Sequence, residues 1–110
     1  MKKENLDNQV NTVLNVVKNK CYITDNSEET TNKVKQMIED AIITIQNQIG
    51  INEEFDFSNP SEERTLLLNY CYYDWNDSSE EFYKNYLNDI LKIRHKYEVK
   101  QNAETQEKQL

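Results

Sequence analysis

Glycine and proline occur only once each in this chain of 110 residues, at Gly50 and Pro60. Sheets of short strands need many tight turns, and such turns depend heavily on glycine and proline. A β-sandwich or a β-barrel is therefore hard to build from this sequence. We expect an all-α fold, a small bundle of about four helices with a polar C-terminal tail.

Apolar residues recur at helical spacing in the first half of the chain, within residues 6–19 and 30–49. The first stripe consists of Leu6, Val10, Val13, Leu14 and Val17, and the second of Val34, Met37, Ile38, Ala41, Ile42, Ile45 and Ile49. Spacings of three and four residues place each set on one face of a helix. Residues 25–27, of sequence Asp-Asn-Ser, are suited to precede the second helix, and Gly50 is suited to end it.

A start signal predicts a third helix. Asn59 is expected as its N-cap, Pro60 as its first residue, and Glu62 as the partner that completes a capping box. The helix is expected to run from there to about Trp75, because apolar and aromatic residues continue up to that point.

A fourth helix is predicted to begin where Ser78 and Glu81 repeat the capping-box spacing, and to end near Tyr97. The turn before it is short, so the third and fourth helices are expected to pack as an antiparallel hairpin. The remaining residues are polar. We therefore divide the chain into a helical domain, 1–97, and a tail, 98–110, which is expected to be disordered or to fold on a partner.

Two pairs of residues outside these stripes are also expected near the core. Cys21 and Cys71 each lie in an apolar or aromatic neighbourhood. We expect two reduced, buried thiols rather than a disulfide, because no apolar run near the N-terminus would direct the protein out of a cytosol. Phe55 and Phe57 alternate before the third helix, and they would either form a short extended piece or pin the loop to the core.

The chain is strongly acidic, with a formal net charge of -7 at neutral pH. A negative surface repels phosphate backbones and releases no counterions from them. Tight nucleic-acid binding is therefore not expected, whereas an acidic wall past which DNA slides without specific binding is compatible with this charge. No window of the sequence is long and apolar enough to span a bilayer, so we expect no membrane contact.

The third helix carries apolar or aromatic residues around its whole circumference. These are Leu66, Leu67, Leu68, Tyr70, Cys71, Tyr72, Tyr73 and Trp75. A helix that is apolar all round must be covered all round. It can be the central helix of the core, or it can turn some rings toward another chain, since Tyr and Trp are favoured at interfaces. The candidate subunit-interface residues are Tyr70, Tyr72, Tyr73 and Trp75.

The run SEERTLLLNYCYYDWNDSSEEFYKNYLNDILKIR, preceded by the helix VKQMIEDAIITIQNQIGI, resembles the head-tail connector (adaptor, head-completion) proteins of tailed bacteriophages. The shared pattern is one of helix lengths and aromatic placement. A helix leads through a loop with an aromatic residue into a helix rich in Leu and Tyr, and an acidic turn then precedes a helix that ends near Leu-x-x-Arg. The pattern covers residues 30–97, and the first helix, 6–19, lies outside it.

The resemblance implies a structural protein of the virion neck. Such proteins assemble as a ring, commonly of about twelve copies, below the portal protein, and they line the DNA channel. The lower face of the ring receives a tail-side stopper or tail-completion protein. Segment 98–110 would then dock on the portal, and the candidate docking residues are Arg94, Lys96, Tyr97 and Lys100. Before assembly the protein would lie in the cytoplasm of the bacterial host.

No pattern of residues indicates catalysis, and we expect neither an enzyme nor a bound cofactor or metal. His95 is the single histidine, and its basic neighbours favour a solvated patch over a catalytic role. The basic residues there, which would complement a helix end or meet an acidic portal surface, are Lys92, Arg94, His95, Lys96 and Lys100. The acidic residues at the expected start of the fourth helix have a structural explanation; they are Asp74, Asp77, Glu80 and Glu81.

The alternative hypothesis is an acidic helical binding protein, an inhibitor that mimics DNA or sequesters a host protein. Such an inhibitor would stay a monomer or a dimer, and it would space its carboxylates along one exposed face. A connector would instead assemble into a ring, so the state of self-assembly separates the two hypotheses.

Overall fold

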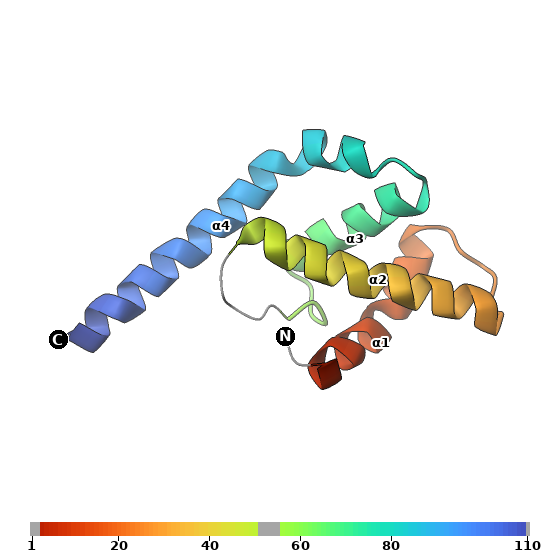
Figure 1. Cartoon of the computed structure of the whole chain (residues 1–110), viewed down its shortest axis with the longest axis horizontal. Coiled ribbons are helices and arrows are strands. Elements are labelled where there is room, and N and C mark those ends of the chain that lie inside the picture. The colour runs from red at the N-terminus through yellow and green to blue at the C-terminus, as the bar shows by residue number, and fades with distance from the viewer. Residues whose placement is uncertain (1–2, 51–55, 110) are drawn as a thin grey trace.

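Four helices make up the part of the chain that the structure describes, residues 3–50 and 56–109 (Figure 1). In this computed structural model they are α1 (Lys3–Lys20), α2 (Glu28–Ile49), α3 (Glu62–Trp75) and α4 (Ser79–Gln109). The described residues contain no strand. The expectation of a small all-α bundle is therefore confirmed.

α2 and α3 form the centre of the bundle. They pack against each other, and both contact α1 and α4, which lie on opposite sides of this central pair (Figure 1). The apolar stripes predicted for the first two helices supply the core, together with residues from α3 and α4. Its largest fully buried side chains include Ile38, Ile42, Ile45, Ile49, Phe57, Leu67, Phe82 and Ile90.

Both ends of α2 are capped by residues that the sequence indicates. Ser27 is the N-cap: its backbone is extended, and its hydroxyl oxygen accepts a hydrogen bond from the Thr30 N–H at 3.2 Å. The Asp25 carboxylate holds this serine by accepting a bond from its N–H at 2.9 Å. At the other end Gly50 has a φ of 71°, a left-handed conformation that glycine adopts without the steric cost of a side chain.

α3 begins later than the sequence predicts. Ser61, not Asn59, is the N-cap, and its hydroxyl oxygen accepts a bond from the backbone N–H three residues further on, at 3.0 Å. Asn59 is held elsewhere, because its side-chain amide donates to the Asp56 carboxylate at 3.1 Å. The expected capping box of Asn59 with Glu62 is therefore wrong, and Pro60 precedes the helix instead of starting it.

α4 is longer than predicted. It begins at Ser79, directly after the expected capping serine, but it continues past Tyr97 to Gln109. Most of segment 98–110, which the sequence suggested as a separate tail, is thus a continuation of this helix. Glu, Gln, Lys and Ala are good helix formers, and a helix that is already nucleated adds residues at little cost.

All the apolar and aromatic residues of α3 except Tyr72 are at least partly covered, and α3 packs against the other three helices. Three of them are buried, namely Leu66, Leu67 and Cys71. Four more are half-buried, namely Leu68, Tyr70, Tyr73 and Trp75. A narrow stripe of this helix stays exposed, and it contains Glu62, Thr65 and Tyr72. The interpretation of α3 as a core helix is confirmed, with its uncovered side mainly polar.

The two cysteines and one phenylalanine lie where the sequence places them. Cys21 and Cys71 are buried and unlinked. Phe57 is fully buried, and its N–H donates to the side-chain oxygen of Gln9 on α1 at 2.8 Å, so it pins its loop to the core. Phe55 lies outside the described residues. Within the described ranges, none of the helices combines the length and the apolarity that a bilayer crossing requires.

Replacing Ser61 by Ala should lower the free energy of unfolding by about 1 kcal/mol, because the first turn of α3 loses its cap. Asn59→Ala, the matched control, removes only an exposed bond outside the helix and should cost less than about 0.5 kcal/mol. Urea denaturation of both variants beside the parent protein measures the two changes. A larger loss for Asn59→Ala would contradict the observed start of α3.

Candidate functional site

Aromatic rings close one end of the seam between α3 and α4. The Tyr70 ring meets Phe82 edge-on at a centroid distance of 5.0 Å, and Tyr73 meets Tyr86 in the same way at 5.9 Å. Phe82 and Tyr86 are stacked at 5.0 Å. Such ring contacts stabilise the hairpin beyond the area that they bury. Burial raises the pKa of Tyr70 to about 12, so this phenol stays neutral.

Most of the candidate interface residues are occupied within the chain. Tyr70 and Tyr73 belong to the aromatic cluster just described. Trp75 is half-buried, and the Lys33 ammonium lies 5.6 Å from its ring centroid. Tyr72 is 37% exposed. Of the four candidates, Tyr72 is therefore the one best placed to meet another chain.

Arg94 of α4 caps the C-terminal end of α2. Its Nε atom donates to the Ile49 carbonyl oxygen at 2.8 Å, and its Nη2 atom donates to the Gln48 carbonyl oxygen. Carbonyl groups in the last turn of a helix lack partners within that helix. A guanidinium at this end also complements the helix dipole. Arg94 therefore fastens α4 to α2 and is not available as a docking residue.

Glu63 links the start of α3 to α4. Its side chain is buried and accepts hydrogen bonds from the Lys96 ammonium at 2.6 Å and from the Tyr97 hydroxyl at 3.0 Å. Burial by itself raises the pKa of Glu63. The bond and charge of Lys96, a bond from the backbone of Glu63 itself and the bond from Tyr97 together outweigh burial, so the pKa lies below its usual value. The carboxylate is therefore charged at neutral pH. We call these three residues the Glu63 network.

The basic residues of α4 do not form the patch at a helix end that the sequence suggested. Because α4 continues to Gln109, these residues lie in the middle of the helix, away from the negative end of its dipole. Lys92, His95 and Lys100 are exposed. Lys100, the remaining docking candidate, has its ammonium 5.8 Å from the Tyr97 ring centroid.

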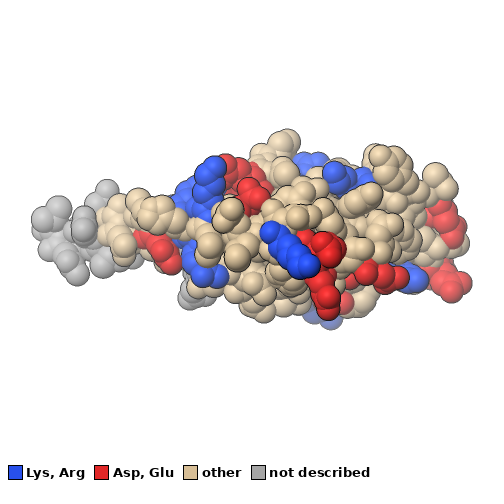
Figure 2. Space-filling view, turned by 90° about the horizontal axis from the view of Figure 1, so that it is seen from above, with Lys and Arg blue, Asp and Glu red and all other residues tan. Residues whose placement is uncertain are grey.

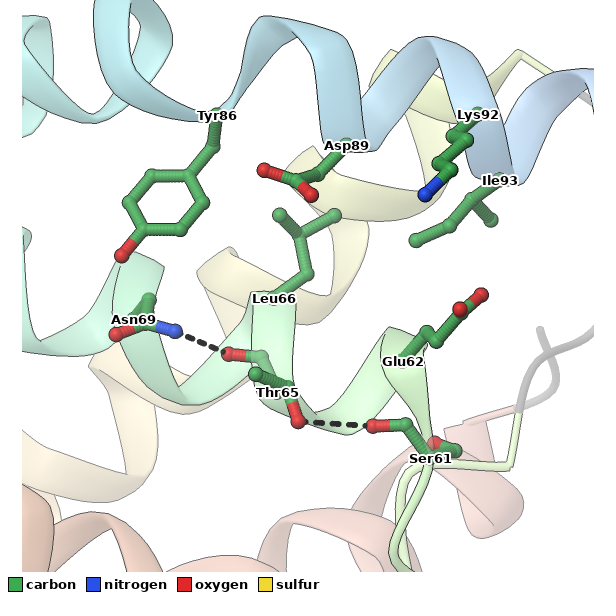
Figure 3. Close-up of a pocket in the computed structure, with 9 residues that line it drawn as sticks. All are labelled: Ser61, Glu62, Thr65, Leu66, Asn69, Tyr86, Asp89, Lys92 and Ile93. Atoms are coloured by element: carbon green, nitrogen blue, oxygen red, sulfur yellow. Dashed lines mark hydrogen bonds between the residues drawn. The ribbon is translucent and has the colours of Figure 1, made fainter.

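A groove of about 410 Å³ runs along the same seam (Figure 3). It is lined by Ser61, Glu62, Thr65, Leu66 and Asn69 of α3 and by Tyr86, Asp89, Lys92 and Ile93 of α4. In Figure 3 the charged side chains of Asp89 and Lys92 extend from α4 toward α3, and Leu66 lies between the helices. The volume suits a small ligand, but the lining mixes both charges with neutral groups, and this mixture selects no particular ligand.

The acidic residues near the α3–α4 turn approach one another. Burial raises the pKa of Asp74, and the charges of Asp40 on α2 and of Asp77 in the turn raise it further. Within residues 3–50 and 56–104, whose side chains the structure describes, no group of His, Cys, Asp and Glu has an arrangement that could hold a metal ion. His95, the single histidine, lies exposed on α4.

No family model, curated protein or solved structure matches this chain. The geometry of its own residues is therefore the basis for any statement about function.

The end of α4 projects beyond the body of the bundle (Figure 1). Residues 98–109, the projecting segment, span about 18 Å as a helix. Residues 98–104 are exposed apart from Gln101, which is half-buried. Val99 is 53% exposed, and its spacing from Ala103 places both on one face. A short apolar strip on an otherwise polar helix thus faces solvent.

Sequence reasoning missed Glu63 as a site residue. It stands three and four residues before Leu66 and Leu67, which places the three on one face of α3. That spacing was the available signal that this acid points into the core. Its partners could not be identified in the same way, because they lie 33 and 34 positions away along the chain.

Glu63 should make the stability of the protein depend on acidic pH. Its pKa is lowered on folding from 4.5, so its contribution is complete above that value and is lost as the pH falls through the folded-state pKa. Urea denaturation from pH 7 down to about pH 3 measures this loss. The Glu63→Gln variant should have a lower free energy of unfolding than the parent at neutral pH. Its free energy of unfolding should fall less than that of the parent when the pH is lowered.

The neighbouring acid provides the control for this measurement. Glu62 also forms an ion pair with Lys96, at 3.6 Å, but both side chains are at least half exposed, and exposed ion pairs contribute little to stability. Glu62→Gln should therefore lose nearly as much stability on acidification as the parent. A Glu63→Gln variant whose stability changes with pH as the parent does would contradict the role of the Glu63 network.

Arg94→Ala should lower the free energy of unfolding by about 2 kcal/mol, because two carbonyl groups of α2 lose a charged hydrogen-bond donor. Lys92→Ala removes an exposed cation from the same helix and should change stability by less than about 0.5 kcal/mol. Thermal and urea denaturation compare the two variants. Equal losses would show that Arg94 does not hold α4 to α2.

Proposed function

We propose that this chain is a structural protein of the virion neck of a tailed bacteriophage, a head-tail connector. In this role it forms a ring below the portal, joins the DNA-filled head to the tail and lines the DNA channel. The observation that carries the proposal is the projecting segment. A compact bundle with an exposed helix directed away from its own core is suited to insert that helix into a larger partner.

The projecting segment has the features of a helix that docks in a groove. Val99 and Ala103 supply a narrow apolar face, and Glu98, Lys100 and Glu104 supply charged groups around it. Recognition of this kind depends on apolar anchors spaced three or four residues apart on one face. The portal protein is the proposed partner. The docking segment 98–110 expected from the sequence is kept in this proposal, without Arg94, Lys96 and Tyr97, which bond within the chain.

A closed ring requires two different contact surfaces on each copy, because one heterologous contact is repeated around the axis. Exposed apolar side chains on the body are available for such contacts. Leu87 and Leu91 of α4 are 54% and 44% exposed, and their spacing places them on one face. Tyr72 of α3 offers an exposed ring on another helix of the body.

The charge of the chain fits a channel through which DNA passes. Each copy carries a formal net charge of -7, so a ring of copies would surround its channel with a negative field. Such a field repels the phosphate backbone and opposes adhesion. The lower face of the ring would then receive the tail-side stopper or tail-completion protein.

The deciding experiment measures the mass of the protein by light scattering. The protein is measured first alone and then mixed with the cognate portal ring. We expect a complex with about one copy per portal subunit, and we expect that deleting residues 98–110 abolishes it. Circular dichroism and thermal denaturation of the truncated protein check that its body remains folded.

A point variant tests the docking face without truncation. Val99→Asp places a carboxylate on the apolar strip of the projecting segment and should weaken portal binding at least tenfold, since an uncompensated charge is costly to bury. Asn88→Asp adds the same charge to an exposed position on the body of α4 and should leave portal binding unchanged. A parent protein that stays monomeric and ignores the portal would overturn the connector proposal.

One observation favours a second function, an acidic inhibitor that mimics DNA or sequesters a host protein. Burial raises the pKa of Asp74, and the nearby charges of Asp40 and Asp77 raise it further. Figure 2 also shows acidic side chains at the end of the molecule opposite the projecting segment. Such a cluster would meet a basic partner surface. A monomeric mass in light scattering, with no portal complex, would favour this function.

A further inference from the structure

The projecting segment does not contain enough apolar surface to hold itself in a helix. Its described side chains include only two apolar residues, Val99 and Ala103. Isolated helices of about twelve residues are marginal in water, because the first turn is costly to form. A segment that continues an existing helix avoids that cost. Besides the contacts of its own side chains, such as that of Lys100 with the Tyr97 ring, its order therefore depends on how firmly the preceding turn is held.

The preceding turn is held by the Glu63 network. Lys96 and Tyr97 are the last two residues before the projecting segment, and both bond to the Glu63 carboxylate. Glu63 itself is fixed, because it lies in the first turn of α3 beside the cap formed by Ser61. One turn earlier, Arg94 ties the same helix to the end of α2.

We infer that the Glu63 network is a conformational device that preorganises the projecting segment as a helix for its partner. The anchored turn serves as the nucleus from which residues 98–104 continue in helical form. A partner then meets an ordered helix and loses less free energy to ordering on binding. The structural step, in which the network orders residues 98–104, concerns the unbound protein alone. The docking step, in which this order favours binding of a partner, rests on the proposed function.

Amide hydrogen exchange of the unbound protein, read by NMR, tests the structural step. Glu63→Gln keeps the size of the side chain and removes the charge that pairs with Lys96. We expect the amides of residues 98–104 to exchange about tenfold faster, which corresponds to a loss of about 1.4 kcal/mol, the size of one charged hydrogen bond. Amides of buried residues in α2, such as Ile38 and Ile45, should keep their rates.

Two further variants keep the test decisive. Glu62→Gln removes only the exposed ion pair that Glu62 forms with Lys96 at 3.6 Å. Exposed pairs contribute little, so this variant should change the exchange of residues 98–104 by less than about threefold. Tyr97→Phe removes one hydrogen bond of the network and retains the ring, so it provides a milder version if Glu63→Gln does not fold. Unchanged rates for residues 98–104 in both network variants, or an equal increase in the α2 amides, would overturn the inference.

Affinity for the portal is measured only as a second, separate quantity. Glu63→Gln should weaken portal binding to the same extent that it speeds exchange in residues 98–104, and Glu62→Gln should not weaken it. Faster exchange with unchanged portal affinity would overturn the docking step. If the parent protein does not bind a portal at all, the proposed function fails, and the exchange measurement still decides whether Glu63 orders the segment.

Discussion

The pairing of α2 with α3 is the constraint on which the rest of this structure depends. α3 carries apolar and aromatic residues on most of its sides. Such a helix must be covered on most of its sides, and a neighbour on one face alone is not enough. α2 presents a continuous apolar stripe to it, while α1 and α4 cover the remaining sides of the pair. The one side of α3 that stays open is mainly polar, which is why a bundle of this size can leave it uncovered.

Polar contacts then determine how α4 sits on this pair. The aromatic cluster fixes the early turns of α4, whereas Arg94 and the Glu63 network fix it further along. A buried carboxylate is tolerated only when it is paired and hydrogen-bonded, and Glu63 meets that condition through two residues of α4. Positive charges that resemble a docking patch in the sequence are thus used to assemble the molecule itself.

This use of charge removes Arg94 and Lys96 from the candidate docking residues and leaves segment 98–110 as the proposed docking element. Residues that bind within the chain cannot also meet a partner without breaking those bonds, so the projecting segment is left as the part of α4 suited to a portal. The body and the segment then have separate tasks. In the proposed function, the body would supply ring contacts and an acidic channel wall, and the segment would supply the attachment to the portal.

The amino-acid sequence by itself determined the four helices, their apolar stripes and the caps of α2, because these features depend on residues only a few positions apart. It placed the start of α3 at Asn59, since it could not show that Asp56 holds that side chain. It also stopped the fourth helix at Tyr97, where apolar periodicity ends. Only the tertiary structure decided the partners of Glu63 and the capping of α2 by Arg94. These contacts join residues 33 to 46 positions apart, and such pairs meet only after the helices have packed.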